Sequence, residues 1–333
     1  MSKSQDTLNK SSYFPQVIVE GVGIHPWNIC SLQLLRNLQK DNATTKESSI
    51  NNSEKQTNRS EELKVSYNLN DKLDVILNPS THHKHKQTLP LEHSPDCPFQ
   101  EWFQKNHALI EFDASTTKPH LNRILLAACI ILRDPQTNKV LLTRRPATSV
   151  IFPKVWVVPG GHSEPEETPM ETALRELREE TGLEAVLPTV KPFCVFESAY
   201  PIALRNGKPK NHHIIIYHIG DVDRRSLQRK NNSSEYDICS ALLPDPSEVS
   251  ACAWVSPEEI PDIIKTDAKS LKTTDCGIIW NAEESKWHPH TFHLSKLQTI
   301  PIAPNSNPPE EHTTIGTLFV LREYLKTFQN KSQ

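Results

Sequence analysis

The chain has 333 residues, of which 36% are hydrophobic and 23% charged, and 26 are prolines. This length predicts two compact units, or one unit with extensions, and the prolines predict long irregular connections. The formal net charge of −3 comes from 37 basic and 40 acidic residues, so the chain has no global field that would attract nucleic acid or an anionic membrane. A polyanionic substrate would have to be bound locally, by a metal ion or a basic patch.

Cysteine usage and the N-terminus both predict an intracellular protein. The seven cysteines are widely spaced and include no Cys-x-x-Cys pair, which argues against a disulfide framework and against a zinc site. We therefore expect free thiols. The N-terminus lacks the apolar core of a signal peptide, and no apolar run reaches the length of a membrane span. We expect a protein of the cytoplasm or nucleus that is not secreted and has no membrane partner.

Residues 1–112 predict a small N-terminal appendage with a βαββ-like order. The apolar pattern predicts a strand within 12–23 and an amphipathic helix over 31–40. Two strands within 62–78, separated by turn residues, predict a hairpin. Residues 41–62 contain too few apolar side chains to offset the entropy of ordering them, so we expect a disordered loop inside the appendage.

From residue 121 onward the pattern changes to that of a mixed α/β domain. The continuous apolar run over 123–132 predicts a strand buried on both faces, and turn residues over 134–138 lead into the second strand of a hairpin. Strands interspersed with helical patterns predict an α/β layer fold. Further strands are predicted over 155–159, 192–198, 212–220 and 251–256, and helices over 256–265 and 314–328.

The stretch "PGGHSEPEETPMETALRELREETGLEA" combines a well-delimited helix with a high density of acids. Thr168 and Glu171 have the spacing of a capping box, and Gly182 is a natural left-handed end, so the helix spans about 169–181. Its apolar stripe is expected to comprise Met170, Ala173, Leu174 and Leu177.

Three glutamates share a strip beside that stripe. Glu176, Glu179 and Glu180 are spaced i, i+3 and i+4, so their carboxylates lie within one turn, and each like-charge pair costs roughly 0.2–0.5 kcal/mol. Arg175 can pair with Glu179 at i+4, but one guanidinium cannot neutralise three acids. Oxygen ligands at this density favour a hard divalent cation, Mg²⁺ or Mn²⁺, over zinc.

The spacing of the defined residues resembles the Nudix box. The pattern comprises glycines, acids, an arginine and aliphatic residues at fixed intervals: Gly161, Glu167, Arg175, Glu176, Leu177, Glu179, Glu180, Gly182 and Leu183. Resemblance to the Nudix hydrolases implies an α/β/α sandwich whose loop–helix–loop holds divalent cations on a nucleoside diphosphate linked to another group. We expect the Nudix hydrolase domain over 121–300, and a C-terminal helix and tail over 301–333.

The resemblance also implies roles for single residues. The expected metal ligands are Glu176, Glu180, Glu179 and the backbone carbonyl of Gly160 or Gly161. Glu179 is alternatively the base that activates water, and the expected catalytic residues are Glu179, Glu176 and Arg175, with Glu167 supporting their geometry. Glu248, just before the strand predicted at 251–256, is expected as a further acid and metal ligand. A metal ion would neutralise the diphosphate and lower the pKa of a bound water, while a carboxylate accepts the proton.

The segments that flank the box bear on the substrate. Those at 140–146, 197–201, 208–220 and 244–259 resemble the Nudix motif 17 family of animals. That resemblance implies hydrolysis of 7-methylguanosine-capped messenger RNA, which releases 7-methyl-GDP and 5′-monophosphate RNA. A cap needs an aromatic clamp for its cationic base and basic residues along its phosphates. The candidates are Tyr200, Trp280 and Trp287 for the clamp and Arg144, Arg145, Lys208 and Lys210 for the phosphates.

Two alternatives remain open. The first is another Nudix substrate, because Tyr200 lies near where dinucleoside polyphosphate hydrolases carry a tyrosine and "LLTRR" resembles a pattern of coenzyme A diphosphatases; an ADP-ribose type of substrate belongs to the same class. The second is a catalytically weak nucleotide- or RNA-binding module that docks partners through its N-terminal appendage. Loss of box acids would favour that module, and none is lost.

Overall fold

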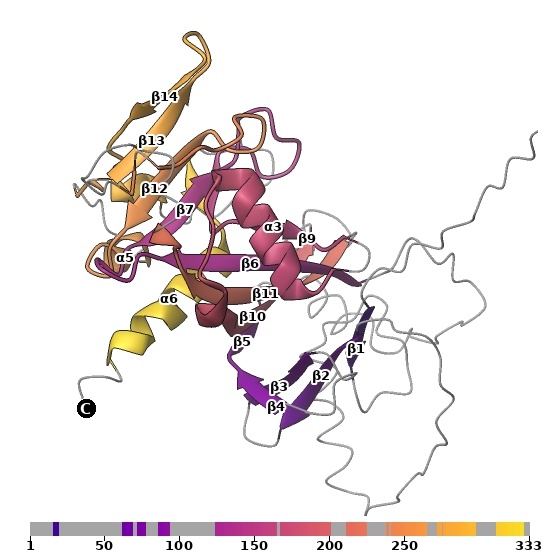
Figure 1. Cartoon of the computed structure of the whole chain (residues 1–333). Helices are drawn as coiled ribbons and strands as arrows, with labels where there is room; N and C mark the ends of the chain where they lie inside the picture. The colour runs from indigo at the N-terminus through magenta and orange to yellow at the C-terminus, as the bar shows by residue number, and fades with distance from the viewer. Residues whose placement is uncertain are drawn as a thin grey trace, which may run out of the picture.

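The structure is a computed structural model, and the described part of the chain falls into segments separated by gaps. These segments are 16–19, 62–68, 72–77, 86–93, 124–164, 167–200, 211–224, 238–239, 241–264, 272–274, 276–297 and 311–329. Within them the strands form a four-stranded sheet and an eleven-stranded sheet (Figure 1). The larger sheet carries helices on both faces, which confirms the predicted α/β sandwich.

The small sheet is formed by strands that precede residue 90. These are β1 (Gln16–Val19), β2 (Glu62–Asn68), β3 (Lys72–Leu77) and β4 (Lys86–Leu89), in that order across the sheet. β1 runs parallel to β2, and the other neighbours are antiparallel. The predicted strand within 12–23 and the hairpin within 62–78 are therefore confirmed. The helix predicted over 31–40 lies outside the described residues, as does the loop over 41–62 up to its last residue.

The hairpin predicted after residue 121 begins the larger sheet. β6 (Ile124–Arg133) pairs with β7 (Val140–Arg144) through Arg133 and Val140, and the Asp134 carboxylate accepts hydrogen bonds from Thr137 in the turn. Apart from this one residue pair, β6 and β7 each pair with further strands. β9 (Gly160–His162) pairs with β6, whereas β8 (Val155–Val157) pairs with β7. The short β9 strand leads directly into the acid-rich helix.

The remaining strands extend the sheet on both sides of β6 and β7. Their bounds are β5 (Leu91–His93), β10 (Lys191–Tyr200), β11 (Asn211–Asp221), β12 (Ala251–Val255), β13 (Cys276–Asn281), β14 (Lys286–Pro289) and β15 (His312–Thr313). The order is β14-β13-β12-β7-β6-β11-β10-β5, with β8, β9 and β15 off this path. β11 is parallel to β6 and β10 is parallel to β5, whereas the β10–β11 and β12–β7 pairs are antiparallel, so the sheet is mixed as predicted.

Three α-helices and two short 3₁₀ turns complete the described part of the chain. They are α3 (Pro169–Thr181), α5 (Ile260–Ile264), α6 (Ile315–Gln329), η1 (Leu187–Thr189) and η3 (Leu294–Leu297). The helix predicted to begin at Ser256 starts at Ile260 instead, because Pro261 has no N–H to continue a helix from Pro257. None of the described helices has the length and apolar character that crossing a membrane requires.

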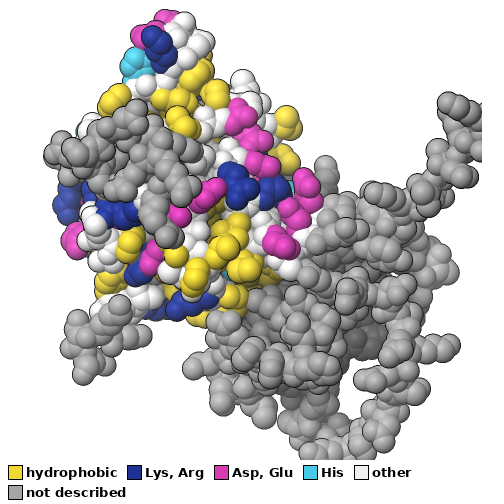
Figure 2. All heavy atoms as spheres, in the orientation of Figure 1, with side chains coloured by type: hydrophobic (Ala, Val, Ile, Leu, Met, Phe, Trp, Pro, Cys, Tyr) yellow, Lys and Arg dark blue, Asp and Glu magenta, His cyan; other side chains and the backbone are white. Residues whose placement is uncertain are grey.

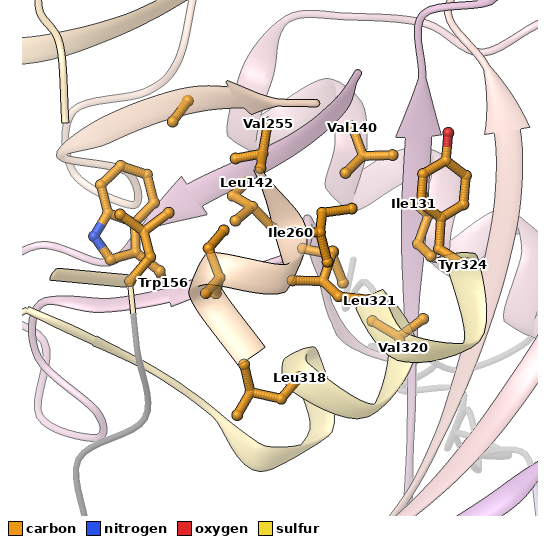
Figure 3. Close-up of a cluster of buried hydrophobic side chains, with 14 of the residues drawn as sticks. Ile131, Val140, Leu142, Trp156, Val255, Ile260, Leu318, Val320, Leu321 and Tyr324 are labelled. Carbon is orange, nitrogen blue, oxygen red and sulfur yellow. The ribbon is translucent and has the colours of Figure 1, made fainter. Parts of the chain in front are cut away.

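The larger sheet separates two hydrophobic cores. Side chains of β6 alternate between them, so Ile131 faces α6 while Ile130 and Leu132 face α3. Figure 3 shows the first core, in which Leu321 and Tyr324 of α6 lie against strand side chains. The helix α6 packs against this core through its apolar residues: Leu318 and Phe319 are buried, and Leu325 and Phe328 are partly buried.

β5 links the N-terminal segment to the larger sheet. It follows β4 after the single residue Pro90 and pairs with the edge strand β10. Glu92 also accepts a hydrogen bond of 2.8 Å from Arg322 of α6. Part of the predicted appendage therefore contributes a strand to the larger sheet.

The expectation of free thiols is wrong for one pair of cysteines. Cys239 and Cys276 form a disulfide with a Cα–Cα distance of 5.9 Å, across 37 residues of sequence. Their spacing gives no local signal, because the fold alone brings the start of β13 beside residue 239. Cys129, Cys194 and Cys252 are free, as expected.

The buried His218 predicts how stability depends on pH. Burial lowers the pKa of this imidazole to about 4, so the fold favours its neutral form. The unfolded chain takes up this proton near the ordinary pKa of histidine, about 6.5. The contribution of neutral His218 to the free energy of unfolding is therefore complete above about pH 6.5, and it decreases by up to about 3 kcal/mol as the pH falls to about 4. Denaturant titrations of His218→Gln should show a flatter decline between these pH values than the wild type. Equal declines would contradict this role.

Candidate active site

The acid-rich stretch folds as its local signals predict. The side chain of Thr168 accepts a hydrogen bond of 3.1 Å from the backbone N–H of Glu171, and the Glu171 carboxylate accepts one of 2.8 Å from the backbone N–H of Thr168. The helix α3 ends at Gly182, which has a left-handed φ of 69°. Within the predicted apolar stripe, Ala173 and Leu177 are fully buried, whereas Met170 is 40% exposed. These contacts fix the helix against the sheet and so fix the positions of its acids.

The glycine pair before α3 allows the backbone of β9 to approach both β6 and the helix. Gly160 has a φ of 152°, and a side chain there would overlap the backbone of Ala128 and Cys129. A side chain at Gly161 would overlap the carboxylate of Glu176. The backbone of the glycine pair therefore lies directly against the glutamates of α3.

Arg175 is the centre of an ion-pair cluster formed by α3 and the loop that precedes it. Its guanidinium donates to Glu167 at 2.6 Å, to Glu176 at 2.8 Å and to Glu179 at 2.9 Å, and also to the His162 carbonyl at 3.1 Å. The predicted i+4 pair with Glu179 is confirmed, and Glu167 and Glu176 are additional partners. The hydrogen bond from Arg175 lowers the pKa of Glu167. One positive charge thus holds three carboxylates in place without neutralising them.

Glu180 lies deeper than the other acids. It is 7% exposed, and its Oε2 accepts a hydrogen bond of 3.2 Å from the Gly160 N–H. Burial, followed by the nearby Glu176 carboxylate, raises the pKa of Glu180 to about 8, although Gly160 and Arg145 act in the opposite direction. Burial also raises the pKa of Glu176, and the charge of Glu248 adds to both shifts. Three acids from α3 and the loop before β12 therefore repel one another around a buried position.

The chemistry of these donors fits a hard divalent cation. Glu176, Glu180, Glu248 and the glycine backbone offer oxygen ligands, and a cation would offset the burial and the like-charge repulsion that raise the pKa of Glu180. Among the described residues, no three acidic, histidine or cysteine side chains converge closely enough to hold a metal ion as they stand. In this structure Glu176 and Glu179 instead accept hydrogen bonds from Arg175.

Figure 2 shows acidic and basic side chains gathered where Figure 1 places α3. Among them Glu179 is the accessible acid of the cluster, with a side chain 50% exposed against 16% for Glu176. Glu179 therefore reaches solvent while it stays hydrogen-bonded to Arg175.

The structure separates the two predicted arginines at the end of β7. Arg144 points into the core that faces α6, where its side chain is 11% exposed, pairs with Glu311 and lies 5.7 Å from the Trp156 ring. Its Nε donates to Ser250 at 2.9 Å, and Trp156 donates to the same Glu311. Arg144 is therefore engaged inside the protein, and we do not retain it as a phosphate contact.

Arg145 points to the opposite face, as strand alternation requires. Its positive charge lowers the pKa of both Glu180 and His162, so the guanidinium lies close to the box. The Nε atom is buried and has no hydrogen-bond partner among the described residues. A cation in this position suits a phosphate oxygen. Of the other predicted substrate contacts, Lys208, Lys210 and the side chain of Tyr200 lie outside the described part of the chain.

Two features of the site were not predicted from the sequence. His162 directly follows the glycine pair, and its Nε2 lies 3.0 Å from Nε2 of His213 on β11. The order of strands β9, β6 and β11 brings them together, across 51 residues of sequence. Trp280 and Trp287 form a cross-strand pair on the hairpin of β13 and β14, which was not predicted.

Comparison with known proteins agrees with this site. A family model described as NUDIX domain matches residues 123–274. A human protein named m7GpppN-mRNA hydrolase NUDT17 is 31% identical over 250 residues, which cover 72% of this chain and 70% of that protein. The zebrafish (Danio rerio) protein of the same name is 29% identical over 252 residues, 73% of this chain and 78% of that protein.

Solved structures include a MutT/nudix family protein from Enterococcus faecalis, which is 13% identical, covers 70% of this chain and 68% of its own, and has a TM-score of 0.36. The assignment depends instead on the box and on the sequence relatives. All the defined box residues are present, and α3 arranges its glutamates around a buried position beside the glycine pair. The chain belongs to the Nudix family and is a Nudix pyrophosphohydrolase.

Proposed function

We propose that the protein hydrolyses the cap of messenger RNA in a metal-dependent reaction, releasing 7-methyl-GDP and 5′-monophosphate RNA. The observation that carries the diphosphate chemistry is the buried Glu180 carboxyl, which lies beside Gly160 and close to the charge of Arg145. The choice of a capped RNA is supported by the human and zebrafish relatives, which are named m7GpppN-mRNA hydrolase.

In this proposal the acids of α3 divide the work. Glu176 and Glu180, with the carbonyl of Gly160 or Gly161, hold Mg²⁺ or Mn²⁺, and Glu248 contributes a further carboxylate. The cation, when bound, neutralises the diphosphate and lowers the pKa of water. Glu179 is the residue best placed to take the proton from water, because it is exposed and already oriented by Arg175. The kinetics of Glu179 variants distinguish this role from the alternative, in which Glu179 is a metal ligand.

Arg145 completes the site from the sheet side. Its guanidinium is close enough to influence Glu180, but none of the described acids forms an ion pair with it, so a phosphate oxygen can take that position. A fixed cation beside the attacked phosphorus stabilises the charge that develops there.

Removal of divalent metal should abolish hydrolysis. We expect no product from capped RNA in the presence of EDTA, and recovery on addition of excess Mg²⁺ or Mn²⁺, because the ligands are all oxygen atoms. Product analysis by chromatography measures this directly. Full activity in EDTA, or recovery with Zn²⁺ but not with Mg²⁺, would contradict the proposed ligands.

A substrate panel separates the alternatives. Capped RNA, dinucleoside polyphosphates, ADP-ribose and coenzyme A should be compared at equal concentration with Mg²⁺. We expect the highest kcat/KM with capped RNA. A higher kcat/KM with one of the small nucleotides would identify that nucleotide, and not capped RNA, as the substrate. Nucleotide binding without any product would identify a binding module.

A further inference from the structure

The ends of three neighbouring strands lie side by side next to the box. Ser250, just before β12, donates a hydrogen bond of 2.7 Å to the carbonyl of Arg144 at the end of β7. Trp280 of β13 donates one of 3.0 Å to the carbonyl of Ser250. Because adjacent strands are about 4.8 Å apart, Trp280 lies two strand spacings, about 10 Å, from the strand that leads into Arg145.

Trp280 also lies on the face of the sheet that carries the box. On β13, Ile278 belongs to the core beneath α3, and alternation places Trp280 on that same face. Trp287, its cross-strand partner, packs against the same core and is only partly buried. Glu248, whose charge reaches Glu176 and Glu180, is two residues before Ser250. The segment before β12 therefore carries Glu248 and, through Ser250, also pairs with Trp280.

The two tryptophans contact each other, which corrects the expected clamp. Their ring centroids are 5.4 Å apart and the ring planes are inclined by 56°. A base cannot be sandwiched between rings that touch in this way. Trp280 is on the strand nearer the box, whereas Trp287 is on β14 at the edge of the sheet. Trp280, which is partly exposed, is therefore the tryptophan nearer the box, and Trp287 lies on the strand beyond it.

We propose that Trp280 is the stacking platform for the base of the nucleoside diphosphate whose phosphates lie between Glu180 and Arg145. This subsite rests on the proposed diphosphate hydrolysis and adds the recognition of the base to it. A ribose bridges the gap between the phosphates and the ring. A base with a positive charge, such as 7-methylguanine, gains a cation–π attraction in addition to stacking.

Calorimetric titration of the full-length protein in Mg²⁺ tests the subsite without relying on turnover. The probes are 7-methyl-GDP, GDP and ribose 5-phosphate, which has no base. In Trp280→Leu the Kd for 7-methyl-GDP should rise about tenfold to a hundredfold, and that for GDP should rise less. Trp280→Phe should recover most of the affinity. The Kd for ribose 5-phosphate should not change.

Trp287→Leu is the matched control, because it removes the other ring of the same cross-strand pair and costs the hairpin a similar packing contact. It should lower the unfolding midpoint as Trp280→Leu does, with the Kd for 7-methyl-GDP unchanged. An unchanged Kd in Trp280→Leu, or an equal rise for ribose 5-phosphate, would overturn the platform. If the protein fails to hydrolyse capped RNA but Trp280→Leu still weakens nucleotide binding, the platform is upheld and only the proposed substrate fails.

Discussion

Glu180→Gln is expected to lower turnover by at least about a hundredfold while the protein stays folded. Glutamine keeps the oxygen that accepts the hydrogen bond from Gly160, but it removes the charge that would hold a cation. The pKa of Glu180 is raised from 4.5 to about 8, so the stability that its protonated form gives the metal-free protein is lost as the pH rises between these two values. The variant should therefore be at least as stable as the wild type without metal, and it should lose any stabilisation by Mg²⁺.

Glu171→Gln provides the control for this prediction. Glu171 is an exposed residue of the same helix, and glutamine also serves in a capping box. Steady-state kinetics and thermal unfolding, each with and without Mg²⁺, should show wild-type behaviour for Glu171→Gln. Turnover by Glu180→Gln within a few-fold of the wild type would remove Glu180 from the metal site.

The adjacent arginines should give opposite results. Arg144→Met leaves the partly buried Glu311 without its ion-pair partner, and we expect it to lower the free energy of unfolding by about 1–3 kcal/mol. Arg145 has no ion-pair partner among the described acids, so Arg145→Met should leave the free energy of unfolding nearly unchanged. Because it removes a charged hydrogen bond to phosphate, it should lower kcat/KM about tenfold to a hundredfold.

Denaturant titration and steady-state kinetics on both variants separate these effects. The double variant Arg144→Met with Glu311→Leu should regain much of the lost stability, since both charges are then removed from the core. A loss of kcat/KM in stable Arg144→Met as large as that of Arg145→Met would mean that both arginines contact the substrate. Normal kcat/KM in Arg145→Met would exclude it as a phosphate contact.

Local signals predicted the box and the strands well because each acts within a few residues. The hydrogen bonds of Thr168 and Glu171 span three residues, and the pairing of Arg175 with Glu179 spans four. Hydrophobic runs located β6, β7 and β10 to within a few residues for the same reason. The hairpin of β13 and β14 was missed, because its connecting residues carry no Asn-Gly or Asp-Gly turn signal.

Contacts between distant segments could not be predicted from spacing. Arg144 and Arg145 look equivalent in the sequence, and only the packing of β7 between two cores assigns them to opposite faces. The order of β13, β12 and β7 places Trp280 beside Ser250, although 30 residues separate them in the chain. The disulfide of Cys239 and Cys276 depends on the same arrangement of strands. The substrate side of the site is thus a property of sheet order, whereas the diphosphate side is a property of one helix.

Metal-dependent hydrolysis of the cap is tested most directly by the masses of the products that the wild-type protein forms from capped RNA with Mg²⁺. We expect 7-methyl-GDP together with RNA that ends in a 5′-monophosphate, and neither product from Glu180→Gln. Release of 7-methyl-GMP, or no cleavage of capped RNA under conditions in which ADP-ribose or coenzyme A is hydrolysed, would contradict it.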